Sequence, residues 1–214
     1  MRLIILGAGA SLKEGVYKGL WEVIKGQDIW AINFMFKVMP YPPSAIIWQD
    51  LGVWVKFKAD ILRAADSGTK LYARPHDDYK NDPRVECYNQ NTEKFFGRAG
   101  IRENKIYTGS MGLTGLYALS LAIAKGYNDL YLCGFDFGTP SVDCDDTHCY
   151  TGLNEGAERR PMIYRTNKGV REEVADFENY KSSEWKIFNV SEISNIQSFP
   201  KISYDEFLKE VKYE

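Results

Sequence analysis

Short apolar runs alternate with longer amphipathic segments along most of the chain, and this alternation constrains the fold more than any other feature. Strands are predicted at Leu3–Leu6, Asp28–Asn33, Ala45–Trp48, Thr69–Ala73, Leu130–Cys133 and Lys186–Val190. Helices are predicted at Leu12–Ile24, Trp54–Ala65, Thr114–Ala124, Gly169–Ser182 and Tyr204–Tyr213. Strands that alternate with helices in this way form parallel sheets covered on both faces. The sequence therefore predicts an α/β fold with a doubly wound, mainly parallel sheet.

Three further segments complete the expected organisation. A polar, turn-rich region at about 74–100 is predicted to form an excursion from the sheet with few regular elements. The segment at about 138–161 is predicted to be a loop at the active site. Ser203, with Glu206 three residues later, has the spacing of a capping box and should open the last helix.

Composition limits the number of domains and the compartment. A chain of 214 residues, 44% hydrophobic, favours one domain over 1–214, and a net charge of -2 gives no general attraction to polyanions. Its four cysteines contain no CxxC pair, which fits reduced thiols in the cytoplasm. No apolar run reaches the roughly 18 residues of a membrane span, and the opening MRLIILGAGASL has too short an apolar core for a signal peptide.

A glycine-rich loop follows the first predicted strand. It contains Gly7, Ala8, Gly9 and Ser11 and opens directly into the first predicted helix. Glycines at such a turn let the backbone approach a phosphate, while the helix start presents unpaired N–H groups. The loop lacks the third glycine of the GxGxxG fingerprint, so the alternative is an ordinary tight turn.

Two polar residues, Asn33 and Asp50, stand at the ends of predicted neighbouring strands. In an open parallel sheet the carboxyl ends of the strands form the edge where ligands bind. Asn33 could donate to and accept from a base or sugar, and Asp50 could accept from hydroxyl groups. Both could equally cap local backbone groups at strand and helix ends.

The segment from Thr114 to Gly152 suggests a constructed site. A small-residue turn leads into an apolar helix and an apolar strand, Asp136 follows that strand, and His148 comes twelve residues later. A neutral imidazole can take a proton from an incoming hydroxyl and become cationic beside a departing phosphate. His148 is therefore the candidate catalytic base.

The loop around His148 has three other readings. Cys144, His148 and Cys149 could bind zinc, although C-x3-H-C matches no common structural template. Asp143 and Asp145 form a DxD pattern that could hold a hard divalent cation. A solvated loop is the third reading. The other histidine, His76, lies in a polar, turn-rich segment and carries less weight.

Several blocks resemble one superfamily in the same order along the chain. TGLYALSLAIAKGYNDLYLCGFDF followed by THCYTG, with ILGAGASL, the IN of AINF and IFNVSEISNIQSFP, is similar to the bacterial lipooligosaccharide sialyltransferases. The blocks are also similar to the archaeal 6-hydroxymethylpterin diphosphokinase-like family and to uncharacterised phage proteins. The resemblance spans most of the chain and implies a Rossmann-like (GT-A-like) nucleotide-binding domain.

The resemblance also implies roles for individual residues. It places His148 as general base and assigns the nucleotide to Gly7, Gly9, Ser11, Asn33, Thr114, Gly115, Gly134 and Asp136. Three further residues complete the candidate nucleotide-binding set, namely Ala8, Asp50 and Phe137. The chain departs from the sialyltransferases at Ala8 and near Asp50, where they have asparagine. It also lacks the two tyrosines that assist their leaving phosphate, since residues 137–140 read FGTP and Tyr150 does not match by position.

Three functions from different classes follow. The favoured one is a nucleotide-sugar-dependent glycosyltransferase without a tightly bound cofactor, whose acceptor is a glycan, a nucleotide or DNA. The second is an ATP-dependent diphosphokinase-like phosphoryl transferase, with magnesium held by Asp50 and Asp136 and by the DxD carboxylates. The third is a non-catalytic nucleotide-binding module.

Overall fold

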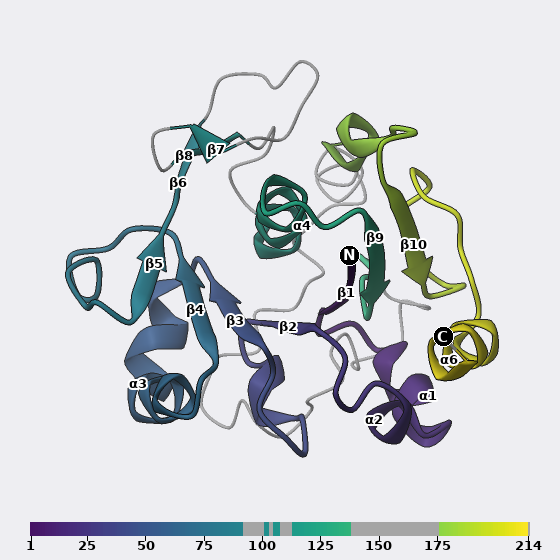
Figure 1. The fold of residues 1–214 in the computed structure, drawn as a ribbon, viewed down its shortest axis with the longest axis horizontal. Coiled ribbons are helices and arrows are strands. Elements are labelled where there is room, and N and C mark those ends of the chain that lie inside the picture. Colours follow the sequence, from purple (N-terminus) through teal and green to yellow (C-terminus); the bar gives the residue numbers. More distant parts are fainter. Residues whose placement is uncertain (92–100, 103–104, 108–112, 138–175, 214) are drawn as a thin grey trace, which may run out of the picture.

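Seven parallel strands form one sheet through the centre of the molecule (Figure 1). The computed structural model describes residues 1–91, 101–102, 105–107, 113–137 and 176–213. The strand order is β10-β9-β1-β2-β3-β4-β5, and all six neighbouring pairs are parallel. The strands are β1 (Arg2–Leu6), β2 (Ile29–Ile32), β3 (Ala45–Trp48), β4 (Lys70–Ala73), β5 (Val85–Cys87), β9 (Asp129–Cys133) and β10 (Lys186–Val190). The predicted α/β fold with a doubly wound parallel sheet is confirmed.

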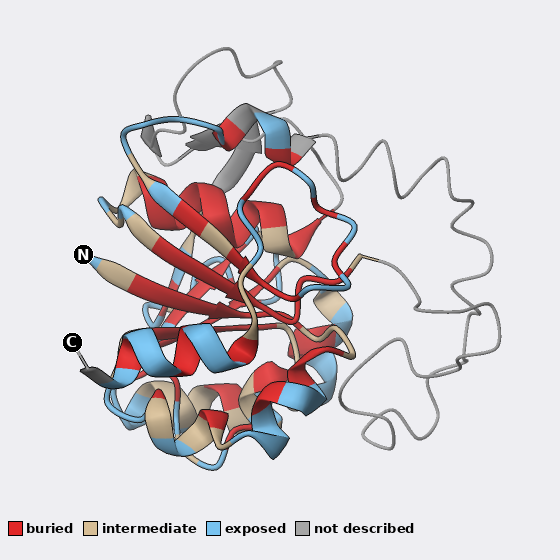
Figure 2. Ribbon diagram, turned by 90° about the vertical axis from the view of Figure 1, so that its right-hand side faces the viewer, coloured by how far each residue is buried: buried red, intermediate tan, exposed pale blue. Residues whose placement is uncertain are grey.

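The central strands are almost entirely apolar because both of their faces are covered. In β1, Leu3 and Ile5 pack into one hydrophobic cluster, whereas Ile4 and Leu6 pack into another on the opposite side of the sheet. This follows from the alternation of side chains along a strand. Continuous apolar runs are typical of parallel strands buried on both faces, and Figure 2 shows the strands of the sheet as mostly buried.

Helices cover the two faces unequally. Helix α4 (Thr114–Ala124) packs on one face, and nearly all of its residues are buried. On the other face lie α1 (Leu12–Tyr17), α2 (Leu20–Val23), α3 (Leu51–Asp66) and α6 (Tyr204–Tyr213) (Figure 1). The termini of α4 and α6 were predicted correctly. At α6 the predicted capping box is present, because the Ser203 N–H donates to Glu206 and the Glu206 N–H donates to the Ser203 hydroxyl.

Two predicted helices differ from the structure. The single helix expected over Leu12–Ile24 is broken into α1 and α2 at Gly19, whose φ of +88° lies in the left-handed region. The helix predicted from Trp54 begins at Leu51 and is kinked at Phe57, where φ is -125° and ψ is 17°. From Gly169–Ser182 the structure describes only residues 176–182, where Asp176–Tyr180 forms a 3-10 helix, η3.

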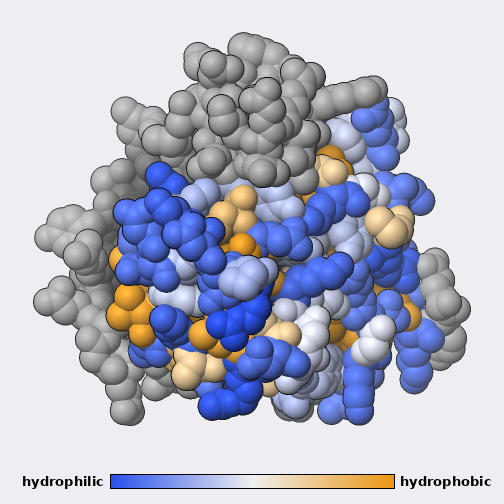
Figure 3. All heavy atoms as spheres, turned by 60° about the vertical axis from the view of Figure 1, so that its left-hand side comes forward, coloured by the Kyte–Doolittle hydropathy of each residue, from blue (hydrophilic) through white to orange (hydrophobic). Residues whose placement is uncertain are grey.

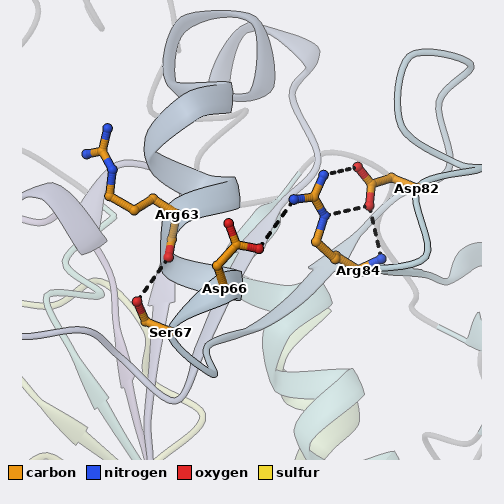
Figure 4. A network of polar contacts seen from close by, with 5 residues as sticks. All are labelled: Arg63, Asp66, Ser67, Asp82 and Arg84. Carbon is orange, nitrogen blue, oxygen red and sulfur yellow. Dashed lines mark hydrogen bonds and ion pairs between the residues drawn. The ribbon is translucent and has the colours of Figure 1, made fainter.

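The predicted excursion at 74–100 instead contains a strand of the main sheet. Strand β5 pairs with β4, with Val85 opposite Leu71. Arg84 fixes the approach to β5, because its guanidinium donates to Asp82 at 2.8 and 2.9 Å and to Asp66 of α3 at 3.4 Å (Figure 4). Three residues among charged neighbours give too short a pattern to predict as a strand.

A second, small sheet follows β5. It consists of β6 (Asn89–Asn91), β8 (Lys105–Tyr107) and β7 (Ile101–Arg102), in the order β6-β8-β7. Residues 92–100 of the predicted excursion and the whole of the predicted loop at 138–161 lie outside the described residues.

The described surface is largely polar. On the side of the molecule shown in Figure 3, hydrophobic residues stand in small groups among charged ones. Val55 of α3, 70% exposed, is one of the few large hydrophobic side chains exposed on the described part of the chain. None of the helices described is long and apolar enough to cross a membrane.

Candidate functional site

The sheet reverses its direction of growth at β1. Strands β2 to β5 follow one another outward on one side of β1, whereas β9 and then β10 are added on its other side. The loops that leave the carboxyl ends of β1 and β9 therefore meet at a topological switch point. In open α/β sheets this is where ligands bind.

The glycine loop after β1 interlocks with the loop after β9. The Gly7 N–H donates to the Cys133 carbonyl, and the Gly9 N–H donates to the Gly134 carbonyl, both at 2.8 Å. A Cβ on Gly9 would lie 2.6 Å from the Asp136 carboxyl carbon. Gly134 has a φ of +71°, and a Cβ there would lie 2.5 Å from the Gly7 carbonyl oxygen. Close packing of the two loops therefore requires these glycines.

Asp136 connects the two loops. Its side chain is buried and accepts hydrogen bonds from the Ser11 N–H at 2.7 Å, the Ser11 hydroxyl at 2.5 Å and the Ser191 hydroxyl at 2.8 Å. These donors satisfy both carboxylate oxygens. Ser11 and Asp136 were predicted from the sequence to lie around one ligand. The structure brings the two residues together, and their side chains are hydrogen-bonded to each other.

The loop after β10 supports the loop after β9. The Ser194 hydroxyl donates to the Phe135 carbonyl at 2.6 Å, and the Asn195 side-chain amide donates to the Phe137 carbonyl at 2.8 Å. The Asn195 N–H also donates to the Asp136 carbonyl at 2.8 Å. The backbone around Asp136 is therefore fixed from two directions.

Asn33 and Gln49 follow the neighbouring strands β2 and β3 and carry buried polar atoms without partners. Asn33 Oδ1 and Gln49 Nε2 have no hydrogen-bond partner among the residues that the structure describes. Asn33 also has a φ of +53°, a left-handed conformation that is uncommon outside glycine. Buried polar atoms are normally hydrogen-bonded, so an acceptor and a donor left open at adjacent strand ends are suited to a ligand.

Four other residues were predicted to bind the nucleotide: Ala8, Thr114, Gly115 and Phe137. Thr114 is buried at the start of α4, and a Cβ on Gly115 would lie 2.7 Å from the Phe135 ring. Phe137, with a φ of +49°, packs its ring against Phe135 and Phe177. Half-buried Ala8 packs on the α1 and α6 side.

Asp50 is exposed at the N-terminus of α3. Its side chain makes no capping hydrogen bond with that helix. It therefore follows β3 as predicted, but the carboxyl group lies apart from the buried cluster around Asp136.

Some predicted residues cannot be placed. His148, Asp143, Cys144, Asp145, Cys149 and Tyr150 all lie outside the described residues. Within the described ranges, no group of three or more His, Cys, Asp or Glu side chains could hold a metal ion. His76 is on the surface, where its ring accepts a hydrogen bond from the Asp78 N–H at 3.2 Å.

Sequence reasoning missed four residues that build this region: Gln49, Ser191, Ser194 and Asn195. Gln49 stands immediately before Asp50, the charged residue that was predicted to bind the ligand at this strand end. The three others lie in NVSEISN, directly after the last predicted strand. Ser191, like Asn33, is a polar residue at a strand end, and this position in the sequence is the signal that identifies it.

The fold is similar to that of three solved glycosyltransferases. The α-2,3-sialyltransferase Cst-I from Campylobacter jejuni superimposes with a TM-score of 0.61 at 17% identity, covering 95% of this chain and 80% of that chain. The sialyltransferase CST-II, solved in complex with a trisaccharide acceptor and CMP, gives a TM-score of 0.56 at 13% identity, covering 95% and 86%. At such low sequence identities, these superpositions show a similar fold and nothing further.

A larger protein shares the fold. The MAf glycosyltransferase from Magnetospirillum magneticum AMB-1 superimposes with a TM-score of 0.60 at 15% identity, and 99% of this chain covers 36% of that chain. No protein-family model and no curated protein sequence matches the chain.

Proposed function

We propose that the protein is a glycosyltransferase that uses a nucleotide sugar as donor, in the manner of the sialyltransferases. One observation carries the proposal: two interlocked loops meet at the switch point of the sheet, and at the adjacent strand ends buried Asn33 Oδ1 and Gln49 Nε2 have no partner within the described part of the chain. The three solved structures of similar fold are glycosyltransferases, which supports the same class of ligand.

In this proposal the donor lies along the carboxyl edge from β9 to β3. Its phosphate lies beside the loop of Gly7 to Gly9, whose backbone passes close to the loop after β9 because glycines have no side chain to come between the two. Asn33 accepts from a donor group of the ligand, and Gln49 donates to an acceptor group. Asp136 acts on the ligand indirectly, since its carboxylate is committed to Ser11 and Ser191.

The proposed reaction is a group transfer assisted by His148. Neutral His148 takes the proton from the acceptor hydroxyl, whose oxygen forms a bond to the anomeric carbon of the sugar. The bond from that carbon to the phosphate oxygen breaks, and the nucleotide leaves with the electron pair. The imidazolium that results stabilises the negative charge on the departing phosphate.

Phosphoryl transfer is the second candidate, and the surroundings of Asp136 disfavour it. In that reaction Asp50 and Asp136, with Asp143 and Asp145 of the DxD pattern, would hold magnesium beside the phosphates, and the last two lie outside the described residues. The Asp136 carboxylate is buried and accepts three hydrogen bonds from Ser11 and Ser191. Asp50 is exposed after β3, which is separated from β9 by β1 and β2. The described carboxylates therefore do not form a magnesium site together.

Titration calorimetry with nucleotide sugars of different bases and with ATP separates the candidates. The glycosyltransferase proposal predicts saturable binding of a nucleotide sugar, retained in EDTA, and its slow hydrolysis without acceptor. Tight binding of ATP that strictly requires magnesium and is lost in Asp50→Ala would support phosphoryl transfer instead. If His148→Ala retained full transfer or hydrolysis, the assignment of the general base would be wrong.

A further inference from the structure

The C-terminal helix α6 packs directly on α1, the helix that follows the glycine loop. Tyr204, the first residue of α6, places its ring on Gly15 of α1, where a Cβ would lie 2.3 Å from the ring carbon Cε1. The next residue, Asp205, accepts a hydrogen bond from Lys18 of α1 at 2.6 Å. The capping box of Ser203 and Glu206 fixes the backbone on either side of Tyr204. The position of the Tyr204 ring is therefore determined from several directions.

Tyr204 is only 2% exposed, and its buried hydroxyl has no hydrogen-bond partner among the residues described. Burial raises the pKa of this hydroxyl well above its usual value, and the Ser11 side chain nearby acts in the opposite direction. Leaving a buried hydroxyl unpaired costs about 1–3 kcal/mol. A buried polar group without a partner in a native structure therefore calls for an explanation.

Ser11 has the acceptor capacity that this hydroxyl needs. Its own proton is committed to Asp136 Oδ1 at 2.5 Å, and its N–H is committed to Asp136 Oδ2 at 2.7 Å. The lone pairs of the Ser11 oxygen can still accept a hydrogen bond. Gly15, on which the Tyr204 ring lies, comes about one helical turn after Ser11. A hydrogen bond from the Tyr204 O–H to the Ser11 oxygen would form a chain from Tyr204 through Ser11 to Asp136.

We propose that Tyr204 is a positioning residue of the ligand site, which holds Ser11 against Asp136 and thereby fixes the glycine loop from the side of α6. The importance of this role for ligand binding rests on the proposed function. The hydrogen bond from Tyr204 to Ser11 that it requires does not depend on any ligand. The C-terminal helix is then part of the site, although none of its side chains needs to touch the ligand.

The test compares Tyr204→Phe with Tyr131→Phe. Tyr131 is an equivalent control because its hydroxyl is also buried without a partner among the described residues, and its ring packs against Phe207 of α6 at 5.1 Å. It lies on β9 beside Arg2, away from the glycine loop. Both substitutions keep the ring and remove one oxygen, so both variants should fold.

Amide hydrogen exchange is measured by NMR for the wild-type protein and both variants without ligand. Tyr204→Phe should accelerate exchange at Gly9 and Ser11 by roughly two- to tenfold, the range that one net hydrogen bond gives, with an unchanged melting temperature. Tyr131→Phe should leave both amides at the wild-type rate. In a Ser11→Ala background, Tyr204→Phe should add nothing, because the acceptor is gone.

Equal exchange in the Tyr204→Phe and Tyr131→Phe proteins would overturn the proposal, whatever the protein binds. Acceleration spread over the whole sheet would also overturn it, because that result shows general destabilisation. If exchange changes as expected but the wild-type protein binds no nucleotide, the role of Tyr204 stands and the proposed function fails.

Discussion

Asp136 holds Ser11 by two hydrogen bonds, at 2.7 Å to its backbone N–H and at 2.5 Å to its hydroxyl. One residue follows β9 and the other ends the glycine loop after β1, so a single carboxylate fixes the relative position of the two loops at the switch point. A carboxylate at this place also occupies an N–H that a bound phosphate would otherwise use. The ligand must then rely on other groups, of which Asn33 and Gln49 are open.

Asp136→Asn should destabilise the fold by about 1.5–3 kcal/mol, the range for hydrogen bonds to a charged group. Asparagine keeps the size of the side chain, but its NH₂ group faces a donor, either the Ser11 N–H or the serine hydroxyls. Urea denaturation measures the change. Asp50→Asn is the matched control and should change the stability by less than about 0.5 kcal/mol, because Asp50 is exposed and makes no capping hydrogen bond. Equal effects of the two substitutions would contradict the role given to Asp136.

Gly9→Ala should disrupt the interlocked loops. The new Cβ would lie 2.6 Å from the Asp136 carboxyl carbon and from the Gly134 carbonyl oxygen. Neither group can move without breaking the hydrogen bonds that join the two loops. Gly52→Ala provides the control, since a Cβ there meets nothing within 4 Å in the first turn of α3. We expect Gly52→Ala to stabilise the protein by up to about 1 kcal/mol and Gly9→Ala to destabilise it. The melting temperatures of both variants test this, and a tolerated alanine at Gly9 would show that the loops are not closely packed.

Asn33→Gly separates the backbone role of Asn33 from the role of its side chain. Glycine accepts a φ of +53° without strain, so the stability should be unchanged or higher. The open Oδ1 is lost, so nucleotide affinity should fall by about tenfold or more, in line with one hydrogen bond in a desolvated site. Asn33→Ala should lose the same affinity and also about 1–2 kcal/mol of stability. If Asn33→Gly bound nucleotide as tightly as the wild-type protein, Asn33 would be a backbone feature only.

The capping box should make the start of α6 sensitive to acid. Hydrogen bonds from the Ser203 N–H and hydroxyl lower the pKa of Glu206. A carboxyl group with a lowered folded-state pKa stabilises the fold above its unfolded pKa, and this contribution is lost as the pH falls through the folded value. The protection factor of the Ser203 amide, which donates to Glu206, should therefore fall as the pH drops below the ordinary glutamate pKa of about 4.3. In Glu206→Gln the protection factor of this amide should no longer depend on acid.

The strand positions were largely predictable because both faces of the sheet are buried. Runs such as AIIW and IWAI have no other stable environment in a chain of this length. The capping box of α6 was also readable, since it depends on residues three apart in the sequence. Strand β5 was missed because pairing with β4 and the ion pairs of Arg84 stabilise it more than its own three residues do.

The sequence indicates where these loops meet in the fold, but not the contacts that they make. Glycines and polar residues after strands indicated the carboxyl edge of the sheet, and Gly9, Gly134 and Asp136 do meet there. That Asp136 faces Ser11 and Ser191 depends on three loops that are distant in sequence. No local pattern contains that information.

We propose that the strand ends at Asn33 and Gln49, beside the interlocked loops, bind a nucleotide. Calorimetric titration of the wild-type protein and of Asn33→Gly with a nucleotide sugar tests this binding. We expect saturable binding of one nucleotide per chain by the wild-type protein, and at least tenfold weaker binding by an equally stable Asn33→Gly variant. Wild-type binding that is unaffected by the substitution, or the absence of binding to every nucleotide sugar tried, would contradict it.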